Sequence, residues 1–359
     1  MYDLAVIGGG PAGASASITA ARYGAKVLLL ERGRYPRHKV CGEFISGEAI
    51  GLLSSLLPDG FVQQGIVLSR ARIFIDGMQL ETKVKPAAVS IPRIDMDFAL
   101  WKAALDAGVD ARQAQAVEHI EGDTPFRIST AAESFTARAL INASGRWSNL
   151  SSNGNGSISE KWLGLKVHFH EVRPEQSVDL YFFDAGYCGV QPVTSAENQD
   201  ANRINVCAMV RAGTATSLET VLHWHPELAK RSAGWKQVFE PVTTFPLTFR
   251  EPSPIQKRIL LAGDAAGFVD PFVGDGISLA LRSGALAAES LRAFFTGTSS
   301  LDQAIGSYRE AYERRLAPVF RASSSIRRML RMPAPVRSSV LFTLKKVPVL
   351  TRYLVSKTR

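Results

Sequence analysis

Cysteine is scarce in this chain of 359 residues. There are only three, Cys41, Cys188 and Cys207, and they stand far apart with no CxxC pair. So few scattered cysteines argue against a disulfide framework and against a dithiol redox motif, and they are usual for a reducing compartment. We therefore expect a cytoplasmic protein without structural disulfides.

Long hydrophobic runs are also missing. No run reaches the roughly 18 apolar residues of a membrane span. The apolar run at the amino end is short and leads into glycines, so a signal peptide is not expected there. The length suggests about two domains, and a hydrophobic content of 46% is enough for a sizeable core.

Acidic residues are absent after Glu313, whereas twelve lysines and arginines follow from Arg314 onward. The chain is thus a near-neutral body with a basic tail. The tail also carries leucine, valine and phenylalanine, which suits the surface of an acidic membrane. A helical cap packed on the body is the alternative, and nucleic-acid binding is not expected because no recognition module is present.

The amino end holds the first positive signal, "YDLAVIGGGPAGASASITAARYGAKVLLLE". An apolar strand at 4–7 runs into glycines, a helix of small residues follows, and a second strand at 26–30 ends in an acid. In such a unit the glycines allow a tight turn, close approach to a pyrophosphate and helix–strand packing, while the acid binds a ribose diol. The sequence predicts dinucleotide contacts at Gly8, Gly10, Pro11, Ala12, Gly13, Glu31 and Arg32.

A second glycine turn lies far along the chain, in "RILLAGDAAGFVDPFVGDGISLALRSG". Together with the opening loop, it resembles the FAD-dependent oxidoreductases of the para-hydroxybenzoate hydroxylase type. The resemblance implies that Asp264, after Gly263, holds the ribityl hydroxyls. It also implies that a helix starting near Pro271, Gly274, Gly276 and Ile277 points its amino end at the flavin. A helix amino terminus stabilises the negative charge of a reduced flavin.

Three weaker matches extend this resemblance from residue 2 to about residue 285. They place Arg93 near the cofactor phosphates, Val117 on a strand that touches the adenine, and Ala143 and Gly145 in a turn after a strand. No second GxGxxG unit is present, so a disulfide reductase with two dinucleotide domains is not expected. NAD(P)H would serve as a transient reductant without a domain of its own.

The segment "YPRHKVCGEFISGEA" resembles the stretch that passes close to the flavin in the geranylgeranyl reductase family, with Lys39, Cys41, Gly42 and Glu43 at the matching positions. "YFFDAGYCGVQPV" is similar to that family's substrate-side strands. Three features differ from related families. The aromatic-proline signature of archaeal geranylgeranyl reductases is not clear, the tryptophan motif of flavin-dependent halogenases is absent, and Ser144-Gly145 replaces the Asp-Gly of aromatic hydroxylases.

Catalytic roles are open at two residues of this segment. Cys41 could donate a proton, tune the flavin or line the pocket, with His38 and Lys39 lowering its pKa, or it could simply be packed. Glu43 could act as acid or base, or be a solvated loop carboxylate. Two pairs of histidines, in "HFH" and "HWH", have zinc-like spacing, but no further ligands complete them, so no metal site is expected.

The predicted fold class is α/β, with a Rossmann-like FAD-binding domain, an inserted mixed or antiparallel sheet as substrate domain, and a carboxyl-terminal helical region. Alternating patterns at 71–75, 162–169, 179–183 and 203–210 predict antiparallel strands of the inserted sheet. "SSNGNGS" at 151–157 predicts a flexible connection. The predicted boundaries are 1–70, 91–150 and 256–300 for the FAD domain, 71–90 and 151–255 for the substrate domain, and 301–359 for the basic tail.

The favoured function is an FAD-dependent oxidoreductase in which NAD(P)H drives reduction of a carbon–carbon double bond in a hydrophobic substrate, isoprenoid or polyketide-like. One alternative is an FAD-dependent monooxygenase that hydroxylates an apolar or aromatic substrate. A second is a non-catalytic flavin-binding scaffold. The expected partners are a hydrophobic small molecule and a membrane surface contacted through the basic tail.

Overall fold

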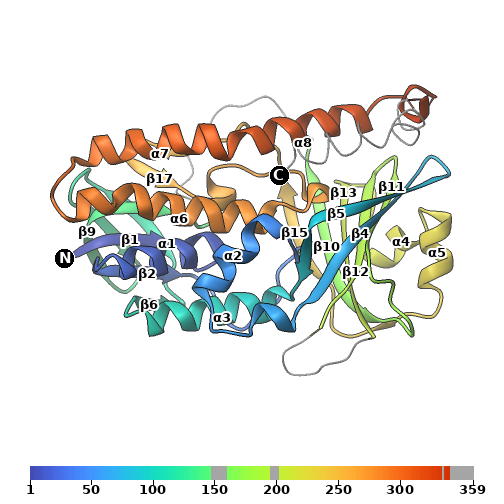
Figure 1. The fold of residues 1–359 in the computed structure, drawn as a ribbon, viewed down its shortest axis with the longest axis horizontal. Coiled ribbons are helices and arrows are strands. Elements are labelled where there is room, and N and C mark those ends of the chain that lie inside the picture. Colours follow the sequence, from blue (N-terminus) through green and yellow to red (C-terminus); the bar gives the residue numbers. More distant parts are fainter. Residues whose placement is uncertain (147–159, 195–201, 334, 340–359) are drawn as a thin grey trace.

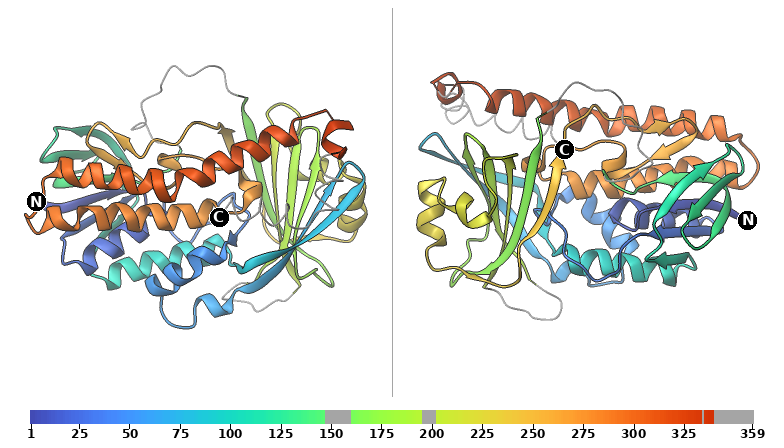
Figure 2. Two further views of the ribbon diagram at one scale, coloured as in Figure 1. Left: turned by 45° about the horizontal axis from the view of Figure 1, so that its top comes forward. Right: turned by 180° about the vertical axis from the view of Figure 1, so that it is seen from behind.

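The computed structural model describes residues 1–146, 160–194, 202–333 and 335–339. Two sheets lie at opposite ends of an elongated molecule, and long helices run beside the first sheet and continue toward the second (Figures 1 and 2). This arrangement confirms the predicted α/β class with a second sheet and a helical carboxyl-terminal region.

The first sheet contains the opening strand. Its central strands are parallel and follow the order β17-β9-β1-β2-β6. Val6 in β1 pairs with Leu29 in β2 and Ile141 in β9, and all three side chains are buried. Buried apolar runs of this kind are what a parallel sheet covered on both faces requires. The bounds are β1 (Tyr2–Ile7), β2 (Val27–Glu31), β6 (Asp110–Gln113), β9 (Ser134–Asn142), β16 (Ile255–Gln256) and β17 (Ile259–Leu261), with the hairpin β7 (Val117–Glu121) and β8 (Phe126–Thr130) attached to β9.

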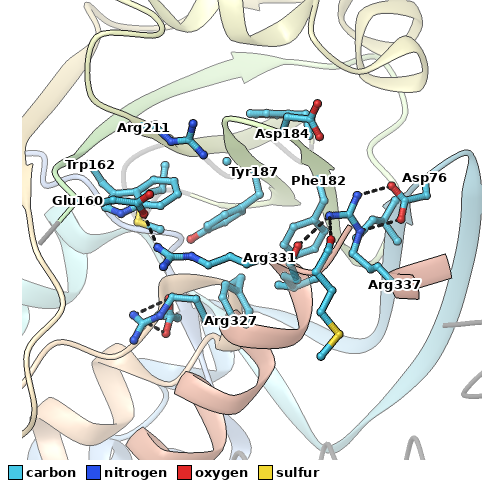
Figure 3. Close-up of a pocket in the computed structure, with 18 of the residues that line it drawn as sticks. Asp76, Glu160, Trp162, Phe182, Asp184, Tyr187, Arg211, Arg327, Arg331 and Arg337 are labelled. Carbon is cyan, nitrogen blue, oxygen red and sulfur yellow. Dashed lines mark hydrogen bonds and ion pairs between the residues drawn. The ribbon is translucent and has the colours of Figure 1, made fainter. Parts of the chain in front are cut away.

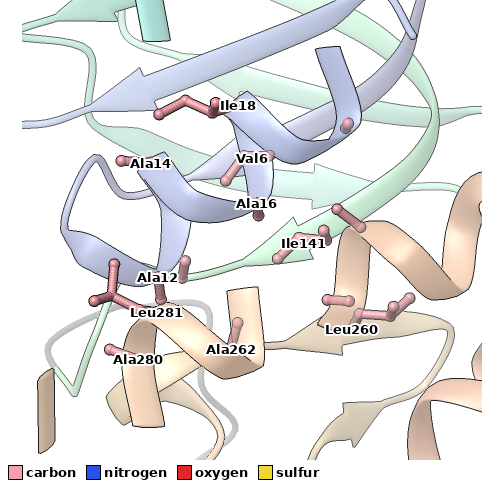
Figure 4. Packing of buried hydrophobic residues seen from close by; sticks show 14 of the residues in the cluster. Val6, Ala12, Ala14, Ala16, Ile18, Ile141, Leu260, Ala262, Ala280 and Leu281 are labelled. Atoms are coloured by element: carbon pink, nitrogen blue, oxygen red, sulfur yellow. The ribbon is translucent and has the colours of Figure 1, made fainter. Parts of the chain in front are cut away.

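Helix α1 (Pro11–Arg22) packs closely against α6 (Gly276–Phe295), and the small side chains of α1 make this possible (Figure 4). A Cβ on Gly284 would lie 2.0 Å from the carbonyl oxygen of Ala12, so only glycine fits at that crossing. Thus the first and the last glycine turn of the sequence are brought together by one helix pair. Helices α2 (Gly47–Leu56), α3 (Arg93–Asp106) and α7 (Leu301–Arg315) complete this half of the molecule.

The second sheet is mixed. Strands β10 and β13 pair antiparallel over their full length, as the alternating pattern predicts, but β11 pairs with β4 in parallel. The predicted mixed or antiparallel sheet is thus a mixed one. β4 and β11 each have an antiparallel neighbour, β5 and β12, but they pair with one another in parallel. The bounds are β3 (Phe44–Ile45), β4 (Ile66–Ile75), β5 (Met78–Ser90), β10 (Trp162–His170), β11 (Val178–Phe183), β12 (Gly186–Pro192), β13 (Arg203–Arg211), β14 (Lys236–Gln237) and β15 (Val242–Leu247), with α4 (Leu218–Leu222) and α5 (Pro226–Ser232) beside them.

The passage between the two sheets lies near the predicted boundary at residue 70. β4 begins at Ile66, a few residues before the predicted boundary at residue 70, and β3 already belongs to the second sheet. Helix α8 (Ala317–Leu330) extends α7 toward the second sheet (Figure 1). The predicted linker at 151–157 and the end of the tail at 340–359 lie outside the described residues. Within the described part, no helix is long and apolar enough to cross a membrane.

Candidate active site

The predicted cofactor residues gather at one edge of the first sheet. Gly8 follows β1, Glu31 ends β2, Ala143 follows β9 and Gly263 follows β17. Because these strands are parallel neighbours, their carboxyl ends meet at the same edge, where ligands bind in open α/β sheets.

The opening loop forms a cradle for a phosphate. Gly8 has φ +100°, and a Cβ there would lie 2.4 Å from the carbonyl oxygen of Ala143. A Cβ on Gly13 would lie 1.8 Å from the carbonyl oxygen of Gly8. By contrast, a Cβ on Gly10 would meet nothing within 4 Å, so the front of the loop is open. No side chain caps α1 at this end, which leaves its first-turn N–H groups available to an anion.

Glu31 is buried beside this cradle. Its carboxylate accepts N–H bonds from Gly9 and Gly33, each at 2.8 Å, and contacts Arg37 at 2.6 Å. Burial favours the neutral acid, but the two N–H donors and Arg37 outweigh burial and lower the pKa of Glu31. The side chain is thus an ionised acceptor at the position expected to bind the ribose. Arg32, also predicted to contact the cofactor, is exposed.

Asp264 follows β17 in a short 3-10 turn, and Arg146 lies next to it, with Nε 3.5 Å from Oδ2. The Arg146 guanidinium stacks on Phe268 at 3.9 Å. Its Nε and Nη1 atoms are buried without a hydrogen-bond partner among the described residues. Buried guanidinium donors normally have acceptors, so an anionic, hydroxyl-rich ligand suits this position. Arg146 was not among the predicted site residues.

The late glycine turn has the predicted form. A 3-10 turn (Pro271–Val273) leads to Gly274, which has φ +79°, and α6 begins at Gly276 without a side-chain cap. Phe44 packs on Gly274, where a Cβ would lie 2.7 Å from its ring. Ile277 is buried in the first turn of α6. The amino end of α6 is therefore placed beside the segment that follows Cys41.

Arg93 and Val117, two residues that the weaker sequence matches placed at the cofactor, lie farther from the glycine cradle or already have a partner. The Arg93 guanidinium forms a two-point ion pair with Asp97, with both bonds at 2.7 Å, and it interacts electrostatically with Cys41. Arg93 therefore lies next to the predicted site but already has a carboxylate partner. Val117 is half-buried at the start of β7, in the hairpin beside β9.

Residues Cys41 to Glu43 form a sharp turn between the two sheets. Gly42 is exposed, a Cβ there would meet nothing within 4 Å, and Glu43 has a left-handed φ of +58°. The Glu43 side chain is fully buried. Its Oε1 contacts Lys166 Nζ and accepts the N–H of Arg93 at 2.7 Å, and its Oε2 is 2.7 Å from His168 Nε2.

This environment bears on the expected acid–base role of Glu43. Burial alone would raise its pKa, but Lys166 and His168 outweigh burial and lower the pKa to about 2. Glu43 is therefore ionised at neutral pH and has no proton to donate. Its alternative, a solvated loop carboxylate, is excluded by its burial.

Sequence reasoning missed the partners of Glu43. Lys166 and His168 alternate with apolar residues in "LGLKVHFH", so both face one side of a strand. A lysine and a histidine side by side on one face of a strand were the available signal for a partner carboxylate. The second half of the "HFH" pair, His170, is exposed. No group of three metal-ligating side chains occurs in the described parts of the chain.

A cavity of about 480 Å³ lies next to the late glycine turn, between the second sheet and α8 (Figure 3). Aromatic rings form much of its lining, and arginines with acidic partners surround them. Two ion pairs bridge the wall, Arg331 with Glu160 and Arg337 with Asp76. The aromatic lining residues are Trp162, Phe182, Phe183, Tyr187, Phe249 and Phe272.

Comparison with known families agrees with this geometry. The family described as "FAD binding domain" matches residues 1–323. The chain belongs to this family. The resemblance to the para-hydroxybenzoate hydroxylase type is thereby confirmed, and the glycine cradle, Glu31 and the buried Arg146 donors that lack a hydrogen-bond acceptor among the described residues fit FAD.

Curated relatives with about a quarter of residues identical include several activities. Conditioned medium factor receptor 1 of Dictyostelium discoideum is 25% identical over 91% of this chain and 70% of its own length. Menaquinone reductase of Mycobacterium tuberculosis is 26% identical over 80% of this chain and 76% of its own length.

Solved structures share the fold across nearly the whole chain. The flavin-dependent brominase Bmp2 superposes with a TM-score of 0.81 at 18% identity, covering 99% of this chain and 93% of that structure. A geranylgeranyl bacteriochlorophyll reductase-like protein from Thermoplasma acidophilum gives 0.76 at 22% identity, covering 94% and 90%. By the family match, the chain is a member of the FAD-dependent oxidoreductase superfamily, and its curated relatives include proteins named as a reductase and as a brominase.

Proposed function

We propose that this FAD-binding protein uses NAD(P)H to reduce a carbon–carbon double bond in a hydrophobic substrate, isoprenoid or polyketide-like. The observation that carries the proposal is the aromatic cavity beside the late glycine turn. Phe272 belongs both to that turn and to the cavity lining, so a ligand in the cavity would reach the cofactor side. The names of the menaquinone reductases and of the geranylgeranyl reductase-like protein support this substrate class.

A bound FAD would supply the chemistry of hydride transfer from NAD(P)H to one carbon of the double bond. The other carbon then needs a proton, which we assign to the hydroxyl of Tyr187, a residue of the cavity lining. Its ring lines the cavity and packs on Phe272, with the ring centroids 5.9 Å apart. Burial raises the pKa of Tyr187 well above its ordinary value, so the hydroxyl is protonated at neutral pH, and after each transfer it would take a proton back from solvent.

The remaining cavity residues would bind and orient the substrate. Trp162 and Phe182 give flat apolar surface, and the enclosing ion pairs of Arg331 and Arg337 connect α8 and the segment after it to the second sheet. Such walls exclude water from the reacting carbons, which protects a hydride donor from side reactions.

The test is an assay with the purified, FAD-loaded protein, without oxygen, using NADH or NADPH and a panel of prenylated quinones and polyketide olefins. The expected product gains two hydrogen atoms, read by mass spectrometry, with nicotinamide oxidised in equal amount. A product that appears only with oxygen and gains an oxygen atom would instead identify a monooxygenase. Incorporation of bromide or chloride would place the chain with the halogenases.

We also propose that the region around α8 contacts an acidic membrane surface, from which a lipid substrate would enter the cavity. Met332 and Val336 are exposed by 39% and 51%, and Arg321 and Arg328 are exposed on α8. Met332 also lines the cavity. Exposed apolar side chains, on the same segment of chain as exposed arginines that form no ion pair with the described residues, suit a bilayer with anionic lipids.

This second proposal is tested by sedimentation with vesicles. Vesicles that contain phosphatidylglycerol should carry the protein down, and pure phosphatidylcholine vesicles should not. Replacing Arg321 and Arg328 by glutamate should release it. Equal binding to both vesicle types, or unchanged binding of that variant, would contradict the proposal.

A further inference from the structure

A buried charged cluster lies where the two sheets meet. Glu43, Lys166 and His168 are each at most 1% exposed. Lys166 and His168 come from β10, whereas Glu43 belongs to the turn that leaves the first half of the molecule. Through Glu43, the second sheet therefore holds a segment 123 residues earlier in the chain.

Stability alone does not account for this cluster. Removing a lysine and a carboxylate from water is costly, and apolar residues of similar size are commonly as stable or more so. Glu43 also adopts a left-handed backbone conformation, which is unfavourable for a residue with a side chain. A buried ion pair on a strained residue instead fixes where that residue and its neighbours lie.

The neighbours of Glu43 are pinned in the same way. Gln191 Nε2 donates to the carbonyl oxygen of Glu43, and Asn205 Nδ2 donates to that of Cys41, both at 3.1 Å. Three strands of the second sheet, β10, β12 and β13, thus hold one short turn.

The other side of this turn faces the cofactor site. Arg93, which interacts electrostatically with Cys41, donates its backbone N–H to Glu43 at 2.7 Å, and exposed Gly42 borders open space. Directly after the turn, Phe44 packs on Gly274, and Ser46 donates to Asp275 at 2.6 Å. A displacement of the turn would therefore reach both Cys41 and the amino end of α6.

We propose that Lys166 and His168 are positioning residues which, by holding ionised Glu43, set the place of the Cys41–Gly42 turn against FAD. FAD affinity and the absorption spectrum of bound FAD would then depend on Lys166, which acts on FAD only through Glu43 and the turn. The inference needs FAD binding but does not depend on which substrate is reduced.

The experiment compares Lys166→Met, the charge-neutral pair Glu43→Gln with Lys166→Met, and Lys161→Met as the control. Lys161 is exposed and immediately precedes β10, so its loss removes the same charge without touching the cluster. Each variant is measured for FAD affinity, for the visible spectrum of bound FAD and, as apoprotein, for the rate at which iodoacetamide alkylates Cys41. Thermal unfolding reports whether each variant is folded.

We expect the neutral pair to remain folded, because it leaves no unpaired buried charge, and yet to bind FAD about tenfold more weakly or worse, with a shifted spectrum and faster alkylation of Cys41. Lys166→Met should show the same changes together with lower stability, and Lys161→Met should match the parent. A folded neutral pair with parental FAD affinity, spectrum and alkylation rate would overturn the proposal. Lys166→Arg, which keeps the cation, should restore the parental spectrum, and failure to do so would equally count against a positioning role.

Discussion

Gly284 and Ala12 touch backbone to backbone, because a Cβ on Gly284 would lie 2.0 Å from the Ala12 carbonyl oxygen. This contact joins the helix after the phosphate loop to the helix after the flavin-side turn. Gly284→Ala should therefore separate α1 from α6 and lower the free energy of unfolding by about 2 kcal/mol or more, as overpacking does. Urea unfolding monitored by circular dichroism measures this loss.

Gly306→Ala is the matched control. Gly306 is also inside a helix, α7, but a Cβ there would meet nothing within 4 Å. Alanine should stabilise that helix by about 0.5–1 kcal/mol. If both substitutions have the same effect, the close crossing of α1 and α6 is not what limits position 284.

Asp264→Ala should lose most of the bound FAD. It removes the predicted acceptor for the ribityl hydroxyls and leaves the buried Arg146 donors without their nearby carboxylate. FAD content per protein, measured by absorbance after gel filtration, is the readout. Asp302→Ala, at an exposed ion pair with Arg258, is the control and should keep its FAD. Full FAD occupancy in Asp264→Ala would remove Asp264 from the site.

Acid should destabilise the protein through Glu43. Because Lys166 and His168 lower its pKa from 4.5 to about 2, this residue stabilises the folded state above pH 4.5, and that contribution is lost as the pH falls toward 2. The shift corresponds to about 3 kcal/mol. Urea unfolding across this range should show the slope in the parent protein.

The variant with both Glu43→Gln and Lys166→Met should lack that part of the acid dependence. It carries no carboxyl at 43 to titrate and no unpaired ammonium at 166. An unchanged slope would mean that other carboxylates, such as Glu31, account for the acid sensitivity.

The binding of FAD should weaken as the pH rises through 8. Burial, helped by Arg37 and Arg93, lowers the pKa of Lys39 from 10.5 to about 8. The protonated form, which is lost above that pH, would attract the anionic cofactor. Titrating apoprotein with FAD at several pH values measures the effect, and Lys39→Met should bind more weakly but without this pH step. A Lys39→Met variant that keeps the step would assign it to another group.

Tyr187→Phe should separate proton transfer from binding. It keeps the ring that packs on Phe272 and removes only the hydroxyl, so FAD affinity should not change. If Tyr187 gives the proton, turnover should fall about a hundredfold or more, in the range usual for general acids. Single-turnover reduction of an olefin identified by the product assay provides the measurement, and an undiminished rate would show that solvent supplies the proton.

The parts that sequence predicts best here are those with local signals. The strand–helix–strand unit from β1 through Glu31 is predicted by the spacing of its glycines and by an apolar, a small-residue and a second apolar segment within about thirty residues. The late turn is predicted by Gly274 and Gly276. Glu43 could not be understood that way. Its partners lie on β10 and became known only when the pairing of the second sheet was fixed, as did the parallel contact of β4 with β11.

The order of the strands has a consequence for synthesis on the ribosome. The phosphate loop is made first, but its neighbours in the fold are made later. Strand β9, which pairs with β1, comes after residue 133, and β17, which pairs with β9, comes after residue 258. Helix α6, which packs on α1, comes after residue 275. A nascent chain that carries only the opening loop therefore lacks most of the walls of its own cofactor site. We therefore expect FAD to bind only after about four fifths of the protein has been synthesised, and the early segments to remain without bound FAD until then.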